Sequence, residues 1–279
     1  RDVQGRAPSQ SGRGVIHMKQ RTHPLLIAFA VLVFLFLIGP LVIILGASLS
    51  DTSYLPFPPQ GLSLRWYENV FEISAFKRTM VISFLLAVGG TALSMLIGIP
   101  AAYALARYRI ELPRFLGNIY VLPILIPEIV LGFSLMKSLA TGLGLPIIAA
   151  LLVGHALLVL PYCVRVVGAS LNSFDFSVEE AAVSLGCPRW KAFFTVVLPN
   201  VRAGIIAGFI LAFITSLNDV SVSIFLTGPG VSTLPIQLLA HMEQFFDPTI
   251  ASVSVLLMGV TVAVMAIVER TLGLTFLTK

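Results

Sequence analysis

Long apolar stretches separated by short polar segments dominate the chain. A helix needs about 20 consecutive, mostly apolar residues to cross the hydrocarbon core of a bilayer. Six stretches reach that length, and we predict that each crosses a membrane as a helix. They cover residues 24–49, 80–105, 115–139, 146–167, 201–226 and 249–268. The pattern therefore predicts an all-α, polytopic membrane protein with six transmembrane helices.

The segments outside the apolar stretches suggest how the chain is organised. Residues 1–23 are polar and basic and begin without methionine, so we expect an N-terminal tail in which Met18 is a candidate natural start. Residues 24–270 would form the six-helix domain, with a loop at 172–200 between the fourth and fifth spans. Residues 271–279 would form a C-terminal tail.

The first loop contains a short helix signal. Ser63 is a candidate N-cap, because its hydroxyl can accept an amide hydrogen bond from the first turn. The helix that follows would carry one apolar face formed by Trp66, Tyr67, Val70 and Phe71. We expect it to lie on the outer membrane surface, with its aromatic rings at the level of the lipid headgroups.

Composition supports a membrane protein and argues against several other classes. The chain is 57% hydrophobic and only 11% charged, well outside the range of soluble domains. Two cysteines and four scattered histidines suggest neither a disulfide framework nor a metal site. The chain has no phosphate loop of the Gly-x-x-x-x-Gly-Lys-Ser/Thr kind and no clustered catalytic groups, so we expect no enzyme activity. Expected partners are membrane lipid and other proteins, not nucleic acid.

The distribution of basic residues orients the six spans. Lys and Arg accumulate in short loops on the cytoplasmic side of a membrane. If both termini are cytoplasmic, fourteen of the eighteen Lys and Arg residues lie inside, at positions 1, 6, 13, 19, 21, 107, 109, 114, 165, 189, 191, 202, 270 and 279. The other four are Arg65, Lys77, Arg78 and Lys137. This orientation places the loop 172–200 in the cytoplasm.

That loop predicts a helix, a bend and a second helix. Ser177 and Glu180 have the spacing of a capping box, in which the serine hydroxyl and the glutamate carboxylate each accept a backbone amide. Gly186 would end the first helix in a left-handed C-terminal cap. Pro188 can start the second helix, and Pro199 would end it. Between these prolines, apolar residues recur at helical spacing at Trp190, Phe193, Phe194 and Val197.

The same loop carries a spaced motif. Glu180-Ala181-Ala182 is followed after three residues by Gly186, and after nine more by Val196, one further residue and Leu198-Pro199. This pattern resembles the signature of the integral-membrane permease subunits of bacterial ABC importers. The alternative is an ordinary pair of amphipathic helices at the membrane interface.

The resemblance implies a type I ABC importer fold and a set of partners. The loop would insert into a cleft on a cytoplasmic ATPase, present in two copies, which would bind the ATP and Mg²⁺; this chain would hold no cofactor. A second homologous permease and a periplasmic substrate-binding protein would complete an importer of the bacterial inner membrane. The implied ATPase-coupling residues are Glu179, Glu180, Ala181, Ala182, Gly186, Leu198 and Pro199.

In detail the chain is most similar to the second permease of spermidine and putrescine importers and their relatives, including those for aminoalkylphosphonates. Pro127-Glu128 and Asn218-Asp219 support this subgroup. Ionisable groups inside a membrane often face a transport path, so Glu128, Asp219 and the adjacent Asn218 are candidates to contact a passing ammonium group. Alternatively, Glu128 satisfies backbone groups freed by Pro127, and Asp219 fixes a helix contact.

Three other classes of function remain open from the residues alone. A secondary transporter would couple uptake to an ion gradient without an ATPase. An intramembrane enzyme would need catalytic groups that face each other, and the spans hold few polar residues. A purely structural membrane protein would not bind a nucleotide-binding subunit.

Overall fold

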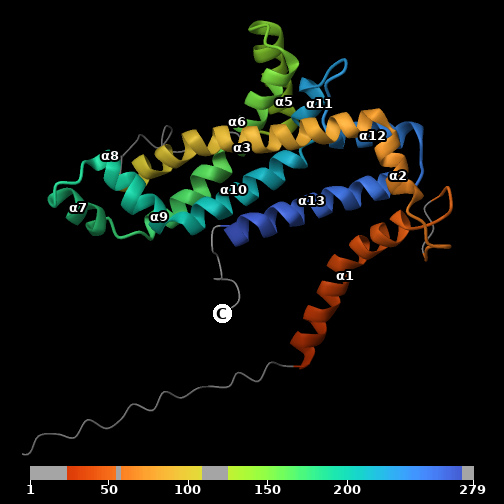
Figure 1. The fold of residues 1–279 in the computed structure, drawn as a ribbon, viewed down its shortest axis with the longest axis horizontal. Coiled ribbons are helices and arrows are strands. Elements are labelled where there is room, and N and C mark those ends of the chain that lie inside the picture. Colours follow the sequence, from red (N-terminus) through yellow and green to blue (C-terminus); the bar gives the residue numbers. More distant parts are fainter. Residues whose placement is uncertain (1–23, 55–57, 109–124, 272–279) are drawn as a thin grey trace, which may run out of the picture. The chain divides into compact units, whose positions relative to one another are not determined.

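The computed structural model describes residues 24–54, 58–108 and 125–271, in which the regular elements are helices, apart from one isolated β-bridge between Gly228 and Val231. Figure 1 shows the elements in chain order. They are α1 (Pro24–Ser48), α2 (Arg65–Glu72), α3 (Ser74–Tyr108), α5 (Glu128–Leu135), the π-helix η2 (Met136–Gly142), α6 (Ile147–Asn172), α7 (Ser177–Ser184), α8 (Arg189–Ala192), the π-helix η3 (Phe193–Val197), α9 (Leu198–Asn200), α10 (Arg202–Leu217), α11 (Ser223–Leu226), α12 (Leu234–Gln244) and α13 (Thr249–Thr271).

Four of these helices are each long and apolar enough to cross a membrane: α1, α3, α6 and α13. They correspond to the first, second, fourth and sixth predicted spans. Helix α3 has 35 residues and extends past both predicted ends, 80 and 105. At 1.5 Å per residue it is about 52 Å long, so it exceeds a hydrocarbon core of about 30 Å.

The third and fifth predicted spans differ from the prediction. Residues 115–124 of the third lie outside the described residues, and its remainder is α5 followed by η2. The prediction of one continuous helix over 201–226 is wrong, because α10 ends at Leu217. There the Asp219 carboxylate accepts the backbone amides of Val222 and Ser223, a local alternative to helical hydrogen bonding. Helix α10 also forms a bent pair with residues 189–200, at an angle of 74°.

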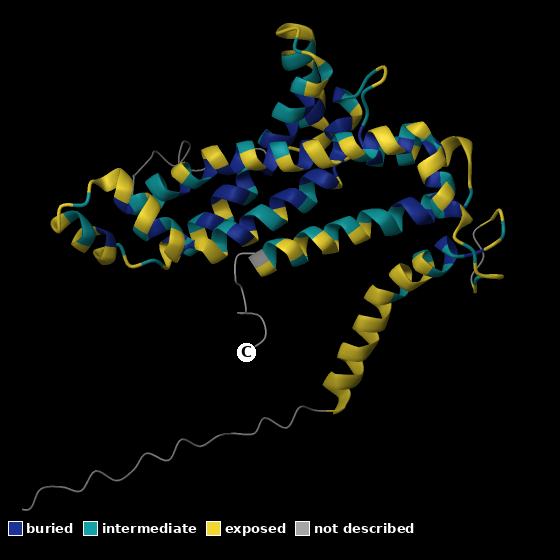
Figure 2. Ribbon diagram, viewed as in Figure 1, coloured by how far each residue is buried: buried dark blue, intermediate teal, exposed yellow. Residues whose placement is uncertain are grey.

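The described residues from Ile44 onward form one compact unit, and the described residues up to Ile43 form another. In the larger unit α3, α6 and α10 pack around a shared apolar core, in which Val159, Cys163, Val167 and Ala212 are fully buried. In the smaller unit, residues 24–43 of α1 are exposed almost throughout, as the yellow ribbon in Figure 2 shows, and most of them are apolar. An apolar helix surface of this kind suits a hydrocarbon environment.

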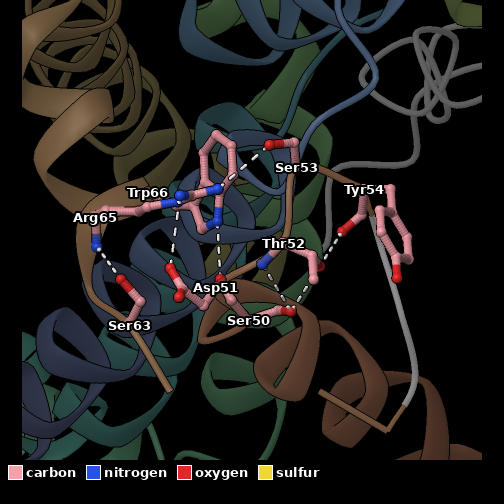
Figure 3. A network of polar contacts seen from close by, with 8 residues as sticks. All are labelled: Ser50, Asp51, Thr52, Ser53, Tyr54, Ser63, Arg65 and Trp66. Carbon is pink, nitrogen blue, oxygen red and sulfur yellow. Dashed lines mark hydrogen bonds and ion pairs between the residues drawn. The ribbon is translucent and has the colours of Figure 1, made fainter. Parts of the chain in front are cut away.

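The first loop is fixed by hydrogen bonds around Trp66 and Arg65 (Figure 3). The Trp66 indole donates to the Ser50 carbonyl at 2.8 Å, and the Arg65 guanidinium lies 3.5 Å from the Asp51 carboxylate. The Ser63 hydroxyl accepts the Arg65 amide, but Leu64 occupies the N-cap position of α2. The expected cap residue is therefore displaced by one position.

The predicted apolar face of α2 is only partly buried. Trp66 and Val70 are buried, whereas Phe71 is 49% exposed. The Asn69 amide donates to the Thr249 hydroxyl at 2.9 Å, which joins α2 to the start of α13. Helix α2 is thus packed against α13, and its position relative to the lipid headgroups stays a prediction.

Glycines allow α5 to approach the interruption after α10. A Cβ atom on Gly132 would lie 2.9 Å from the Ser221 carbonyl oxygen and from the Val222 Cα atom. Because both are backbone atoms, they cannot move aside as a side chain would. We expect Gly132→Ala to lower the free energy of unfolding by about 1–3 kcal/mol, the usual cost of overpacking, measured from thermal unfolding in detergent.

The matched control is Gly259→Ala in α13, where a new Cβ would meet nothing within 4 Å. It should leave stability unchanged or raise it by up to about 1 kcal/mol, because alanine is the better helix former. Equal unfolding temperatures for the two variants would contradict the close approach of α5.

Candidate coupling site and substrate path

Helix α7 begins at Ser177, as predicted, but its first turn is capped differently. Phe176 occupies the N-cap position, and the Asp175 carboxylate accepts the Ser177 amide at 3.0 Å. This hydrogen bond lowers the pKa of the Asp175 carboxyl below its ordinary value. The predicted capping box is wrong, because the Glu180 carboxylate bonds to Arg107 of α3 and not back to the start of its own helix.

The acidic residues of α7 tie this helix to the end of α3. The Glu179 side chain is only 3% exposed, and its two oxygens accept hydrogen bonds from the Tyr103 hydroxyl and from Nε of Arg107. Nη2 of Arg107 also donates to Glu180 at 2.9 Å. A buried carboxylate is stable only when it is paired and hydrogen-bonded. We call Tyr103, Arg107, Glu179 and Glu180 the α3–α7 clamp.

Aromatic rings surround the α3–α7 clamp. The Tyr103 ring lies edge-on to Phe193, with ring centroids 4.8 Å apart, and to Phe176 at 6.2 Å. The Arg107 guanidinium lies 5.4 Å from the centroid of the Phe176 ring. These contacts partly exclude water from the ion pairs, which strengthens them relative to pairs fully in water.

The bend after α7 is confirmed at Gly186. Its φ of +91° is left-handed, and two hydrogen bonds close the helix around it. The Gly186 amide donates to the Val183 carbonyl, and the Cys187 amide donates to the Ala182 carbonyl. This pair of bonds is the Schellman motif, which favours glycine at the left-handed position.

The second helix of the loop starts after Pro188, as predicted, and continues to Asn200 through α8, η3 and α9. Pro199 lies in its last turn, one residue before the helix ends. Ala192 and Val197 are fully buried, whereas Trp190 is 69% and Phe194 is 61% exposed. Leu185, beside the bend, is 89% exposed. We call Leu185, Trp190 and Phe194, the three large apolar side chains that these two helices and the bend between them expose most, the docking face, since exposed apolar surface can mark an interaction site.

The remaining predicted coupling residues lie in the same pair of helices. Ala182 and Leu198 are half-buried, and Ala181 and Pro199 are exposed. The structure thus brings the motif residues together in one compact loop. Their role in coupling stays a prediction.

The candidate path residues occupy different environments. Glu128 is the first residue of α5 and is exposed, directly after Pro127. Asn218 is exposed, whereas Asp219 is 6% exposed and its carboxylate accepts hydrogen bonds from Val222 and Ser223. Within the described part of the chain, no interaction joins Glu128 to Asn218 or Asp219. Contact of any of the three with a cargo stays a prediction.

Comparison with known proteins identifies the family. Residues 94–273 match the family described as binding-protein-dependent transport system inner membrane component. The chain belongs to this family. The match begins within α3 and includes both halves of the α3–α7 clamp and the whole loop 172–200.

Relatives of this permease transport amines. It is 30% identical to the putrescine transport system permease protein PotI of Escherichia coli K12, over 85% of this chain and 86% of that protein. It is 26% identical to the spermidine/putrescine transport system permease protein PotC of Haemophilus influenzae, over 86% of this chain and 93% of that protein. The predicted permease function is confirmed, and the relatives are transport subunits and not enzymes.

Solved structures confirm the permease fold. A bacterial ABC transporter that imports the polysaccharide alginate matches with a TM-score of 0.64 and 20% identity, over 90% of this chain and 95% of that one. The MetNI methionine ABC transporter matches with a TM-score of 0.62 and 18% identity, over 74% of this chain and 97% of that one. The all-helical fold predicted from the sequence is that of an ABC transporter permease.

Tyr103 and Arg107 are site residues that the sequence did not reveal. Arg107 was counted only among the cytoplasmic charges, and Tyr103 carried no signal. Their partner Glu179 is 76 and 72 residues away, respectively. A local pattern contains no information on such a pairing.

The α3–α7 clamp predicts how the permease responds to loss of Arg107. Arg107→Met would leave Glu179 buried with only the Tyr103 hydroxyl. An unsatisfied buried acceptor costs about 1–3 kcal/mol, equivalent to about 5- to 150-fold in an opening equilibrium. We expect hydrogen exchange of the α7 amides to accelerate within that range.

Arg189→Met is the matched control. Arg189 lines a cavity of about 480 Å³ together with the four residues of the clamp, and the described residues contain no ion pair to it. Its replacement should leave exchange in α7 unchanged. Equal exchange rates in the two variants would show that the clamp does not hold α7.

Proposed function

We propose that this permease forms half of the translocation path of an ATP-driven importer, and that a cytoplasmic ATPase moves it through residues 172–200. The observation that carries the proposal is the two-sided construction of this loop. Its acidic side is bound to α3 through Arg107, while its docking face exposes three large apolar side chains. A partner that binds the docking face and moves the loop would therefore also move α3.

The clamp suggests how a movement of the loop reaches the other side of the membrane. Helix α3 runs unbroken from Ser74 to Tyr108. Near its far end the Ser83 hydroxyl accepts the Leu234 amide at 2.7 Å, which joins α3 to α12. Nucleotide binding shifts such a system only if it stabilises one conformation more than the other. Closure of the ATPase on the docking face would supply that difference.

The expected assembly contains two ATPase copies, a related second permease and a periplasmic substrate-binding protein. ATP and Mg²⁺ would bind to the ATPase, and this chain would supply no cofactor site. A solved alginate transporter whose permease resembles this chain was crystallised with its substrate-bound periplasmic protein. We infer six spans in the bacterial inner membrane with both termini in the cytoplasm, an orientation that rests on the distribution of Lys and Arg.

The proposed cargo is a polyamine or a related small amine, because PotI and PotC are named for putrescine and spermidine. A second candidate is an aminoalkylphosphonate. The chain is 24% identical to a 2-aminoethylphosphonate transport system permease protein, PhnV, of Salmonella paratyphi A. Both cargo classes carry an ammonium group, for which the exposed Glu128 carboxylate is a candidate contact.

Reconstitution of the whole importer in proteoliposomes tests this function. Labelled putrescine or spermidine should enter when ATP and the binding protein are present, and not with a non-hydrolysable analogue. Competition by 2-aminoethylphosphonate would identify the second cargo class. Uptake driven by an ion gradient without ATP would show instead a secondary transporter.

Substitution of Gly186 tests coupling without removing or adding a side-chain contact. A Cβ atom there would meet nothing within 4 Å, so substitution acts only through the left-handed backbone. That conformation costs an ordinary residue about 1–2 kcal/mol, and more for a β-branched one. We expect Gly186→Val to lower ATP-driven uptake while the protein still inserts into the membrane.

Gly186→Asn is the control, because asparagine tolerates the left-handed region. It should retain most of the uptake. If Gly186→Val transported as fast as the wild type, the bend would not serve coupling.

Trp190 tests whether the docking face binds the ATPase. Large aromatic side chains commonly dominate interface energies, at 2 kcal/mol or more when truncated. We expect Trp190→Ala to lower the amount of ATPase that co-purifies with the permease. The control is Phe246→Ala, because Phe246 is also 69% exposed but lies between α12 and α13. It should not change the amount of ATPase that co-purifies. Equal recovery of the ATPase with both variants would show that it binds elsewhere.

A further inference from the structure

Four buried polar side chains meet where the fifth apolar stretch is interrupted. His155 of α6 is 1% exposed, Ser216 is 2%, Asp219 is 6% and Ser223 is 0% exposed. Nδ1 of His155 lies 2.8 Å from the Ser216 hydroxyl, and Nε2 lies 3.1 Å from the Ser223 hydroxyl. The Ser223 hydroxyl donates to Asp219 at 2.7 Å. We call these four residues the His155 network.

The direction of these hydrogen bonds follows from the Asp219 carboxylate. An ionised carboxylate only accepts, so Ser223 gives its one hydroxyl proton to Asp219. The Ser223 oxygen is then left to accept from Nε2 of His155. Nδ1 of His155 lies within hydrogen-bond distance of the Ser216 hydroxyl, and the protonation of the ring decides which of the two atoms donates. The network is thus a continuous chain from α10 through α6 to α11.

The Asp219 carboxylate is occupied by its own chain. One oxygen accepts the Val222 amide at 3.2 Å, and the other accepts both the amide and the hydroxyl of Ser223. Asn218 differs, because its side chain is exposed and its amide nitrogen donates to the Ile214 carbonyl. The side-chain oxygen of Asn218 remains available as an acceptor.

Neighbouring helices hold the interrupted segment in place. Gly132 of α5 lies against the backbone of Ser221 and Val222, and a Cβ atom on Gly154 of α6 would come within 2.6 Å of Leu226. Irregular backbone at membrane depth is tolerated only where it is buried in protein or lines a water-filled cavity. An exposed amide at this point therefore suits an aqueous path better than lipid.

We propose that His155 and Asp219 are positioning residues, joined through Ser223, that hold residues 218–222 so that the Asn218 side-chain oxygen faces the translocation path. The proposal rests on the transport function above and deepens it. It assigns the polar contact with the cargo at this point of the path to the neutral amide of Asn218 and not to the adjacent Asp219 carboxylate.

The first test measures the reactivity of introduced cysteines in membranes that contain the assembled importer. Cys187 is replaced by serine, whereas Cys163 is buried and is retained. The probe is a cationic, membrane-impermeant methanethiosulfonate. Asn218→Cys should react at least about tenfold faster than Leu217→Cys, because thiol reactivity follows exposure and Leu217 is only 3% exposed.

Breaking the chain of hydrogen bonds should then loosen the segment. Adding Ser223→Ala should raise the rate at Leu217→Cys at least about fivefold, since a buried site reacts through local opening. Ser216→Ala removes the hydroxyl that contacts Nδ1 of His155, and it should also raise the reaction rate at Leu217→Cys. Ser134→Ala is the control, because that exposed serine bonds only to its own helix at Val130. An unreactive Asn218→Cys, or unchanged rates in both serine variants, would overturn the proposal.

Uptake kinetics provide the second test. Lost cargo binding raises KM. We expect Asn218→Ala to raise KM, and Asp219→Asn to raise KM by no more than Asn218→Ala does and to add little to it in the double variant, because Asp219 acts through Asn218. The double variant Asp219→Asn with Ser223→Ala should lower uptake little more than the worse of the two single variants, because the two residues act as a unit.

A rise in KM for Asp219→Asn that adds in full to the rise for Asn218→Ala would show direct cargo contact and overturn the proposal. The cysteine reactivities are measured without ATP. If the wild type showed no ATP-driven uptake, the proposed function would fail, and the cysteine rates would still decide this inference.

Discussion

The burial of the Glu179 carboxylate constrains the cytoplasmic end of this permease. A charge taken out of water is stable only with close partners, and Glu179 finds them in Tyr103 and Arg107, at the end of the longest helix. If α7 moved away alone, Glu179 would lose the hydrogen bonds from Tyr103 and Arg107, and Arg107 would lose both of its carboxylate partners. The loop and α3 are therefore expected to move as one body.

The clamp also explains why the loop exposes its apolar side. Glu179 is buried against α3, Glu180 bonds to Arg107 while 62% of its side chain stays exposed, and Leu185, Trp190 and Phe194 are exposed. This is the reverse of the usual arrangement in a soluble protein. The arrangement is reasonable for a surface that a partner covers, and the Schellman turn at Gly186 fixes its shape without using any of those side chains.

The sequence predicted those features of the fold that depend on short-range patterns. Hydropathy located α1, α3, α6 and α13, because crossing a bilayer requires a long apolar run. The cap at Gly186 was predictable because it is decided by one residue's backbone freedom. The capping box at Ser177 failed for the opposite reason: an ion pair with Arg107, 73 residues away, takes the Glu180 carboxylate that a local rule assigned to its own helix.

The interruption after Leu217 shows the same limit inside the apolar region. Hydropathy remains high through residues 220–226, so a pattern of apolar positions predicts one helix. It does not register that Asp219 can bind the amides of Val222 and Ser223, nor that His155, 61 residues before Ser216, completes the network. In both regions a carboxylate, of Glu180 in the loop and of Asp219 after α10, accepts hydrogen bonds from other groups of the same chain.

It follows that an acidic residue within a span of this permease is not, by its charge alone, evidence of cargo contact. Of the two acidic residues proposed for the path, Asp219 is buried and hydrogen-bonded, whereas Glu128 is exposed. An ammonium cargo needs acceptors that are not already occupied. By that criterion the Glu128 carboxylate and the Asn218 side-chain oxygen are available, and Asp219 serves by keeping Asn218 in place.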